Sequence, residues 1–224
     1  MKKVMVFMIL FFFFSITLVF SIGLSMGGTV GGTIGWINGS DWINALNFFG
    51  GNNKIKLGFS VGIFINIELH EYLSIQPGIL FSNQGGAYQY YYMGNNIDGT
   101  ISSNVLEIPI LFNPKIPIGT GYFVFSIGPE IIIFLGDVKI KESGFGMTVE
   151  TGRTPDNDIV FGLSAGIGYE YPLGSGNIIF DLKYTKTLTE IFRGDNSSFN
   201  GVGIRIGFST KTLRTFSAKF LNII

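Results

Sequence analysis

Lys54–Leu69 has the sequence KIKLGFSVGIFINIEL, with large apolar residues at the odd positions. These residues are Ile55, Leu57, Phe59, Val61, Ile63, Ile65, Ile67 and Leu69. The even positions between them are polar or small except for Phe64. Successive side chains of a β-strand point to opposite faces, so a period of two predicts one strand with an apolar face and a polar face. Soluble strands are usually roughly 5–6 residues long. This longer, two-faced strand is typical of a transmembrane β-barrel, which has lipid outside and a polar lumen inside.

The composition limits the classes of protein that the chain fits. Its 224 residues include 32 glycines and 23 phenylalanines, a single histidine and no cysteine, and the formal net charge is zero. The length fits one or two soluble domains or one small barrel. Without cysteine, disulfides, thiolate metal sites and a lipoprotein anchor are excluded. No basic excess indicates nucleic-acid binding. We expect no metal ion and no cofactor.

Residues 1–22 have the order of a secretory signal peptide. Lys2 and Lys3 precede the apolar run Val4–Phe20, and small residues follow it. This order predicts cleavage near Ser21–Ser25. The alternative is an uncleaved transmembrane anchor, although a run of about 17 residues is at the short limit for a helical span. No later stretch is an uninterrupted helical span, so we expect a mature membrane protein to be a barrel.

Alternating patterns predict eight strands whose connections are in turn long and short. The expected strands are 27–37, 54–69, 73–82, 102–116, 122–135, 158–171, 177–188 and 201–209. The long connections are the loops 38–53, 84–101, 137–157 and 189–200. Bacterial outer-membrane barrels have short periplasmic turns and longer external loops. We therefore predict an all-β fold, an eight-stranded up-and-down antiparallel transmembrane β-barrel over residues 23–209. For the extension 210–224, a helix, further strand and disorder are all open.

Several short segments resemble a known family. They are LSIQPG at 73–78, LEIPIL at 106–111, SIGPE at 126–130, GIGYEY at 166–171 and DLKY at 181–184. With these segments the sequence resembles the porin-like outer-membrane β-barrel domain family, whose members are small eight-stranded barrels of bacteria with two membranes. The resemblance covers most of the mature chain, and LEIPIL is its most specific part. It implies the barrel fold and an outer-membrane location, and it implies little about activity.

Charged residues on the inward faces predict a lumen charge network. Its candidate members are Lys56, Glu68, Glu107, Glu130, Glu170, Asp181, Lys183 and Arg205. The interior of an eight-stranded barrel is just filled by side chains. Charges there must pair, because removing one partner of a buried pair costs about 3–5 kcal/mol. We expect a lumen network of Glu107, Glu130, Asp181, Lys183 and Arg205. Two roles are open for it, a polar plug that holds the barrel and a small ion path.

One segment formally matches a hydrolase motif. GLSAG at 162–166 fits G-x-S-x-G, but a nucleophile elbow needs a strand-to-helix turn around the serine together with a histidine and an acid. Here the serine lies in an alternating strand, and His70 lies in a predicted turn on the periplasmic side. We therefore interpret these small residues as part of a lumen face and predict no catalytic residue.

Tyr88, Tyr90, Tyr91 and Tyr92 form an aromatic group in the second long loop. One interpretation is an aromatic girdle at the level of the lipid headgroups, or an extension of the strand. The other is a contact surface for a partner, because tyrosine supplies contact area at low entropic cost. We favour the girdle or strand extension.

These patterns favour a non-enzymatic outer-membrane barrel with a structural or adhesion-like role. We expect a monomer in outer-membrane lipid, with an extracellular partner at the four long loops. The alternative is a narrow porin-like channel for ions or small solutes, although open porins have 16–18 strands. A barrel lipid-modifying enzyme would need a serine, histidine and acid near the outer edge. A soluble lipocalin-like barrel would turn its apolar faces inward.

Overall fold

The computed structural model describes residues 23–190, 198–210 and 213–214, and the predicted signal peptide lies outside them. The strands that form the wall are β1 (Gly23–Asn38), β3 (Lys56–His70), β4 (Leu73–Tyr92), β5 (Asn95–Ile118), β6 (Gly121–Phe134), β9 (Ile159–Leu173), β10 (Gly176–Thr187) and β11 (Ser198–Thr210). The remaining elements are α2 (Ser40–Phe48), β2 (Asn52–Lys54), β7 (Val138–Gly144), β8 (Met147–Arg153) and β12 (Leu213–Arg214).

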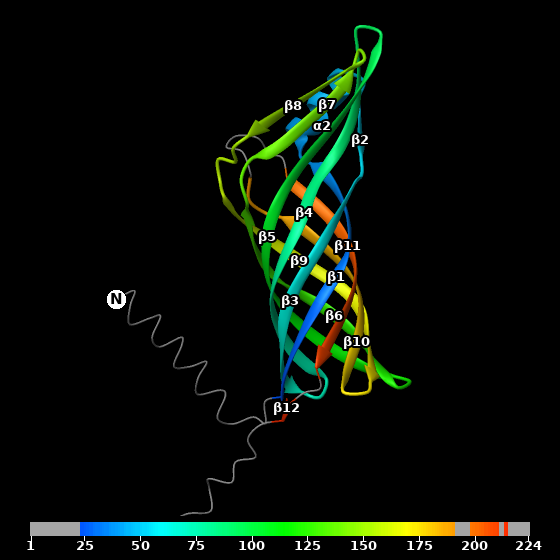
Figure 1. Ribbon diagram of the computed structural model, residues 1–224, viewed down its shortest axis with the longest axis vertical. Helices are drawn as coiled ribbons and strands as arrows, with labels where there is room; N and C mark the ends of the chain where they lie inside the picture. The colour runs from blue at the N-terminus through cyan, green and yellow to red at the C-terminus, as the bar shows by residue number, and fades with distance from the viewer. Residues whose placement is uncertain (1–22, 191–197, 211–212, 215–224) are drawn as a thin grey trace, which may run out of the picture.

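The eight wall strands described here form a closed antiparallel ring. Each pairs with the next along the chain in the order β1, β3, β4, β5, β6, β9, β10, β11, and β11 pairs back with β1. Closure leaves no open sheet edge, which lipid could not satisfy with hydrogen bonds. Figure 1 shows the long tilted strands as one barrel. The predicted all-β, up-and-down barrel fold is confirmed.

The outside of the barrel is apolar and the inside is mixed. On β3, Leu57 is 73% exposed and Ile63 is 64% exposed, whereas the alternate residues Ser60 and Asn66 are buried. The odd-numbered apolar face of the opening strand therefore points outward. A band of exposed apolar side chains around a closed barrel is what a bilayer requires. No described helix is long and apolar enough to cross a membrane.

One inward apolar side chain shows why the wall of this narrow barrel needs a glycine. Phe64 breaks the polar face of β3, and its ring is buried inside the barrel. The ring lies against Gly27 of β1, where a Cβ atom would collide with it. Gly27 is paired with Phe64 in the sheet register. The missing side chain therefore makes room for the large one opposite.

Three of the predicted long loops contain regular structure, which corrects the loop prediction. The segment 38–53 contains helix α2 and the start of β2, and the segment 137–157 is mostly the β7–β8 hairpin. The segment 84–101 continues β4 and β5 as one long hairpin. Its two turn residues Met93 and Gly94 both have positive φ, as do Phe145 and Gly146 between β7 and β8. Two-residue turns of this kind match the twist of paired strands, so the hairpins stay regular to their tips.

These additional elements lie at the end of the barrel opposite the short turns, as Figure 1 shows. Of the fourth predicted loop, residues 191–197 lie outside the described part of the chain, and β11 already begins at Ser198. In the C-terminal extension, Leu213 and Arg214 form β12, which pairs with Gly23 and Leu24. This short stretch is therefore further strand.

Candidate functional site

The middle of the lumen holds one lysine between two glutamates. Lys183 of β10 places its Nζ atom 2.9 Å from Oε2 of Glu107 on β5 and 3.1 Å from Oε1 of Glu130 on β6. All three side chains are buried. Inward positions of three strands thus meet around one ammonium group.

Neutral side chains donate hydrogen bonds to the same two carboxylates. Ser164 donates to Oε2 of Glu130, and Thr185 donates to that oxygen over 3.3 Å. Gln84 Nε2 donates to Oε1 of Glu107 over 2.5 Å. The two carboxyl groups outnumber the one ammonium group, so these donors satisfy acceptor positions that the lysine leaves open. The serine of the G-x-S-x-G sequence is therefore a buried hydrogen-bond donor within a strand.

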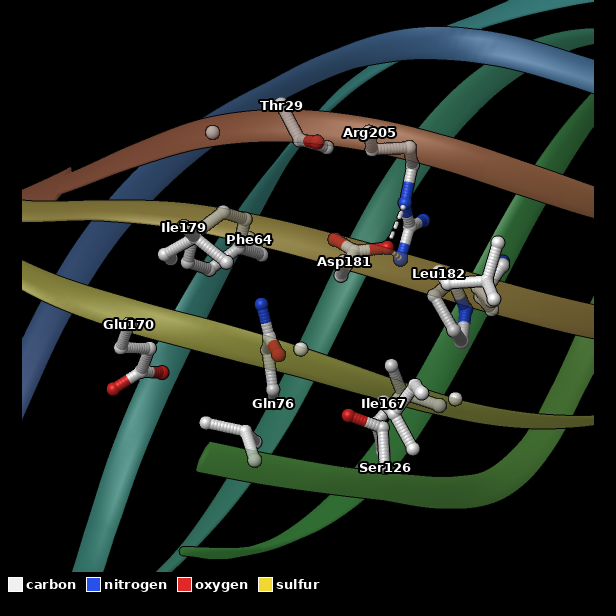
Figure 2. A pocket seen from close by; sticks show the side chains of 18 of the residues that line it. Thr29, Phe64, Gln76, Ser126, Ile167, Glu170, Ile179, Asp181, Leu182 and Arg205 are labelled. Carbon is white, nitrogen blue, oxygen red and sulfur yellow. Dashed lines mark hydrogen bonds and ion pairs between the residues drawn. The ribbon is translucent and has the colours of Figure 1, made fainter. Parts of the chain in front are cut away.

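Two further ion pairs lie in the lumen. Nε and Nη2 of Arg205 on β11 both lie 2.7 Å from Oδ1 of Asp181 on β10. Figure 2 shows this pair bridging the two neighbouring strands. Lys115 of β5 places Nζ 2.8 Å from Oε2 of Glu170 on β9, close to the short turns. Charges on the wall are thus paired at more than one level of the lumen.

The structure divides the expected lumen network into separate groups. Among the described residues, no hydrogen bond or ion pair joins the Arg205–Asp181 pair to the Lys183 cluster. Lys56 instead donates to the side chain of Asn83, and Glu68 lies near the short-turn end of β3. The expected network does not include Lys115, which pairs with Glu170. The alternation of β5 indicates that Lys115 points inward, but it does not indicate that Glu170, on another strand, is its partner.

The space that remains in the lumen is small. Two cavities of about 40 Å³ each lie inside the barrel, and Lys183 and Arg205 line both of them. The first extends toward Gln76 and Glu170, as Figure 2 shows. A cavity of roughly 10–15 Å³ on this measure holds one water molecule. The described lumen therefore has room for a few waters between its ion pairs.

An apolar core covers the outer end of the lumen. It consists of Ile37, Leu46, Tyr88, Ile101, Val105, Ile132, Phe134, Val138, Val160 and Phe199. These residues come from six wall strands together with α2 and β7. Val105, Ile132, Val138 and Val160 are fully buried. The inward faces thus change from charged in the middle of the barrel to apolar at its outer end, which closes the lumen there.

The four tyrosines lie on the outer extension of β4 and divide between its two faces. Tyr88, Tyr90 and Tyr92 line a pocket with Trp42 of α2, whereas Tyr91 points away and is 56% exposed. Tyr88, Tyr90 and Tyr92 therefore do not form a lipid-facing girdle, because they belong to the inner face of the strand. The four tyrosines instead belong to a strand extension, because β4 continues to Tyr92.

The outer aromatic group contains one carboxylate. The Tyr88 hydroxyl donates to Oε1 of Glu142 on β7 over 2.7 Å. Burial and the neighbouring Glu142 carboxylate raise the pKa of the Tyr88 phenol, and the same causes raise the pKa of Tyr90. Both phenols therefore remain protonated donors at neutral pH. The described residues contain no group of three or more histidine, aspartate or glutamate side chains placed to hold a metal ion.

Sequence comparison connects this closed barrel with a known family. The family model for the outer membrane protein beta-barrel domain matches residues 15–193. The chain belongs to this family. This match confirms the resemblance noted from LEIPIL and the other segments, and with it the localisation in the bacterial outer membrane. Among curated proteins, none matches the chain.

Solved structures of small outer-membrane barrels match this chain over most of their own length. Neisserial surface protein A has 10% identity and a TM-score of 0.45, covering 83% of this chain and 96% of its own. OprG of Pseudomonas aeruginosa has 11% identity and a TM-score of 0.41, covering 85% and 95%. Ail of Yersinia pestis has 14% identity and a TM-score of 0.36, covering 84% and 98%. Similarities this remote say nothing about function.

Proposed function

We propose that the protein is a non-enzymatic outer-membrane barrel that contacts partners outside the cell through its ordered outer elements. The observation that carries the proposal is the closed lumen. Lys183, Glu107 and Glu130 bridge strands across its middle, and the apolar core covers its outer end. A barrel closed in this way serves as a scaffold, and the part left to contact a partner is the surface that it presents.

The outer elements support a contact role because they expose apolar side chains beyond the lipid-facing band. Phe48 at the end of α2 is 82% exposed, and Met93 at the tip of the β4–β5 hairpin is 76% exposed. Met147 at the start of β8 is 69% exposed. Large exposed apolar groups of this kind are typical of interaction surfaces. Regular hairpins and a helix hold them in defined positions.

The same geometry favours a non-enzymatic monomer. Ser164 is buried in the lumen beside Glu130, while His70 lies in the turn between β3 and β4 with its ring against Tyr72. The serine and the histidine thus belong to different levels of the barrel. Outward apolar residues such as Ile110, Phe161 and Ile204 lie on well-separated wall strands, as a barrel surrounded by lipid requires.

Planar-bilayer recording distinguishes the scaffold from the alternative of a narrow channel. We expect the purified, folded protein to give no reproducible single-channel steps, because the ion cluster and the apolar core lie in series along the lumen. Sizeable, reproducible steps would refute the closed-scaffold proposal and favour the channel.

Retention of cells on surfaces tests the contact role. Cells that display the protein are compared with cells that display a variant in which residues 144–147 of the β7–β8 tip are replaced by Asn-Gly. The matched control changes the short turn at Gly174 and Ser175, at the opposite end of the barrel. We expect the trimmed variant alone to lose retention on protein-coated or lipid-coated surfaces. Equal retention of all three, at equal surface display, contradicts a contact role for this tip.

A further inference from the structure

A pocket of about 300 Å³ lies between α2, β4 and β7 at the outer end of the barrel. Its lining residues are Trp42, Ala45, Leu46, Phe49, Tyr88, Tyr90, Tyr92 and Glu142. Five of these side chains are aromatic, and one is a carboxylate. The outward residues at this level of β4 are Ala87, Gln89 and Tyr91, which lack the large aliphatic side chains of the apolar band, so the pocket lies at its outer limit or beyond. It is therefore accessible from outside the cell.

The aromatic walls of the pocket are held in place. Trp42 donates from Nε1 to the side chain of Asn53 over 2.8 Å, and Asn53 donates in turn to the Ile37 carbonyl over 2.8 Å. The indole meets Tyr88 edge to face, with 5.0 Å between ring centroids. Tyr88 stacks on Tyr90 at 6.2 Å and an interplanar angle of 13°. A fixed set of ring faces needs little reorganisation when a ligand binds.

The end of α2 is also joined to the tyrosine strand. The Tyr91 amide donates to the Phe49 carbonyl over 3.3 Å. The Phe49 ring lies 5.9 Å from that of Tyr90. β2 pairs with β4 directly below this point, from Asn52 opposite Gln89 to Lys54 opposite Ala87. The helix, and with it one wall of the pocket, is therefore fixed to the sheet.

The carboxylate of the pocket has no cationic partner in the part of the chain that the structure describes. Glu142 accepts the Tyr88 hydroxyl, which is neutral. Lys139 of the same strand lies 3.7 Å from Glu150, and Lys54 of β2 lies 2.8 Å from Asp98. A half-buried negative charge among aromatic rings attracts a cation, and the ring faces add a cation–π attraction.

We propose that this pocket binds a quaternary ammonium group, such as the trimethylammonium head of choline. A primary ammonium carries three N–H donors that lose water on entry, and ring faces replace that water poorly, so its acceptors in the pocket are Glu142 and the tyrosine hydroxyls. A trimethylammonium group has no donor, and its methyl groups fit the apolar surfaces of Ala45 and Leu46. Glu142 neutralises its charge while the rings of Trp42 and Tyr90 contact its methyl groups. This inference names a ligand class for the proposed outer contact face and rests on that proposal.

Titration with choline chloride tests the pocket directly. The full mature barrel is folded in octyl glucoside, because detergents with a choline head would compete. A Trp36→Phe background leaves Trp42 as the tryptophan that reports binding among the described residues. We expect saturable quenching by choline, and binding about tenfold weaker for the uncharged isostere 3,3-dimethylbutan-1-ol. Equal binding of the two compounds, or no binding of choline, overturns the proposal.

Two matched pairs of variants locate the binding. Glu142→Gln is expected to weaken choline binding about tenfold, whereas Glu150→Gln on the same hairpin leaves it unchanged. Tyr90→Leu is expected to weaken it by a similar factor, whereas Tyr91→Leu on the opposite face of β4 has no effect. Heat-modifiable gel mobility establishes that each variant is folded. If folded Glu142→Gln binds choline as well as the parent, the carboxylate has no role and the proposal fails.

Vesicles distinguish the two sources of the head group. Capture of phosphatidylcholine vesicles, but not phosphatidylglycerol vesicles, with competition by free choline, identifies a lipid head group. Binding of free choline without vesicle capture identifies a small solute, and both results support the same pocket chemistry. If choline fails to bind while the β7–β8 tip still governs cell retention, only the pocket inference falls. If choline binds and cell retention does not depend on the tip, only the contact proposal falls.

Discussion

Replacing Lys183 by methionine is expected to destabilise the barrel by about 3–5 kcal/mol or more, the usual cost of removing one partner from a buried ion pair. The lysine lies 2.9 Å from Glu107 and 3.1 Å from Glu130. At an effective dielectric constant of about 20, each contact at roughly 3 Å contributes an attraction of about 5 kcal/mol. Desolvation offsets much of that attraction in the native protein. Methionine keeps the chain length but leaves two buried carboxylates facing each other.

Urea unfolding of the folded protein in detergent or lipid measures the change. Tryptophan emission and heat-modifiable mobility report the transition. Lys186→Met is the matched control, because Lys186 lies three residues further along the same strand on the exposed outer face. The control is expected to stay within about 0.5 kcal/mol of the parent. Adding Glu107→Gln and Glu130→Gln to Lys183→Met is expected to recover most of the loss.

Two outcomes would refute the reasoning. If Lys183→Met unfolds within about 0.5 kcal/mol of the parent, as an uninvolved surface site would, the two carboxylates are not held by the lysine. If the triple variant is no more stable than Lys183→Met, the loss comes from altered packing and not from unpaired charge. A recovery in the triple variant alone supports an electrostatic plug.

Three further predictions concern the lipid face, the contact between Gly27 and Phe64, and the outer pocket. Ile63→Arg is expected to cost about 2–4 kcal/mol of unfolding free energy in lipid, because Ile63 points outward near the middle of its strand; a neutral result would mean that this face is not in the bilayer. Gly27→Val is expected to cost about 1–3 kcal/mol by crowding the Phe64 ring and the Phe208 carbonyl, and Phe64→Ala is expected to restore only the part of the loss that comes from the ring. Burial and Glu142 raise the pKa of Tyr88, so its protonated form is favoured by folding. The resulting contribution of Tyr88 to the free energy of unfolding is complete below the unfolded tyrosine pKa of about 10 and is lost as the pH rises above it. In an alkaline absorbance titration, Tyr88→Phe should therefore remove only the last part of the curve, and loss from the early part would contradict the prediction.

The wall strands and the orientation of their side chains were predictable from the sequence. Alternation placed Ile63 outside and Glu107 and Lys183 inside, because the direction of a side chain in a strand depends only on its position. Which inward charges meet was not predictable. Lys183 and Glu107 are 76 residues apart, and their contact depends on the tilt and stagger of the closed barrel. The expected single network is accordingly divided into separate groups.

The outer elements are the part of the fold that the sequence patterns predict least well. The polar composition of segment 38–53 is typical of a loop, although Trp42, Leu46 and Phe49 have the spacing of one helix face. The hairpin tips were also missed. Met-Gly at 93–94 and Phe-Gly at 145–146 are not the usual Asn-Gly or Asp-Gly turn pairs, although the glycine supplies one of the positive φ angles that such turns need.

By itself, the sequence determined the membrane barrel, the two faces of its wall and the outer-membrane family, because these follow from local periodicity and from recognisable segments. Only the tertiary structure decided what the outer end of the lumen contains. The apolar core is assembled from six wall strands with α2 and β7, and the pocket of Trp42, Tyr90 and Glu142 is assembled from α2, β4 and β7. These residues are brought together by barrel closure and by hairpins that extend beyond the lipid. Periodicity along one strand carries no information about distances between strands, so that assembly required the folded chain.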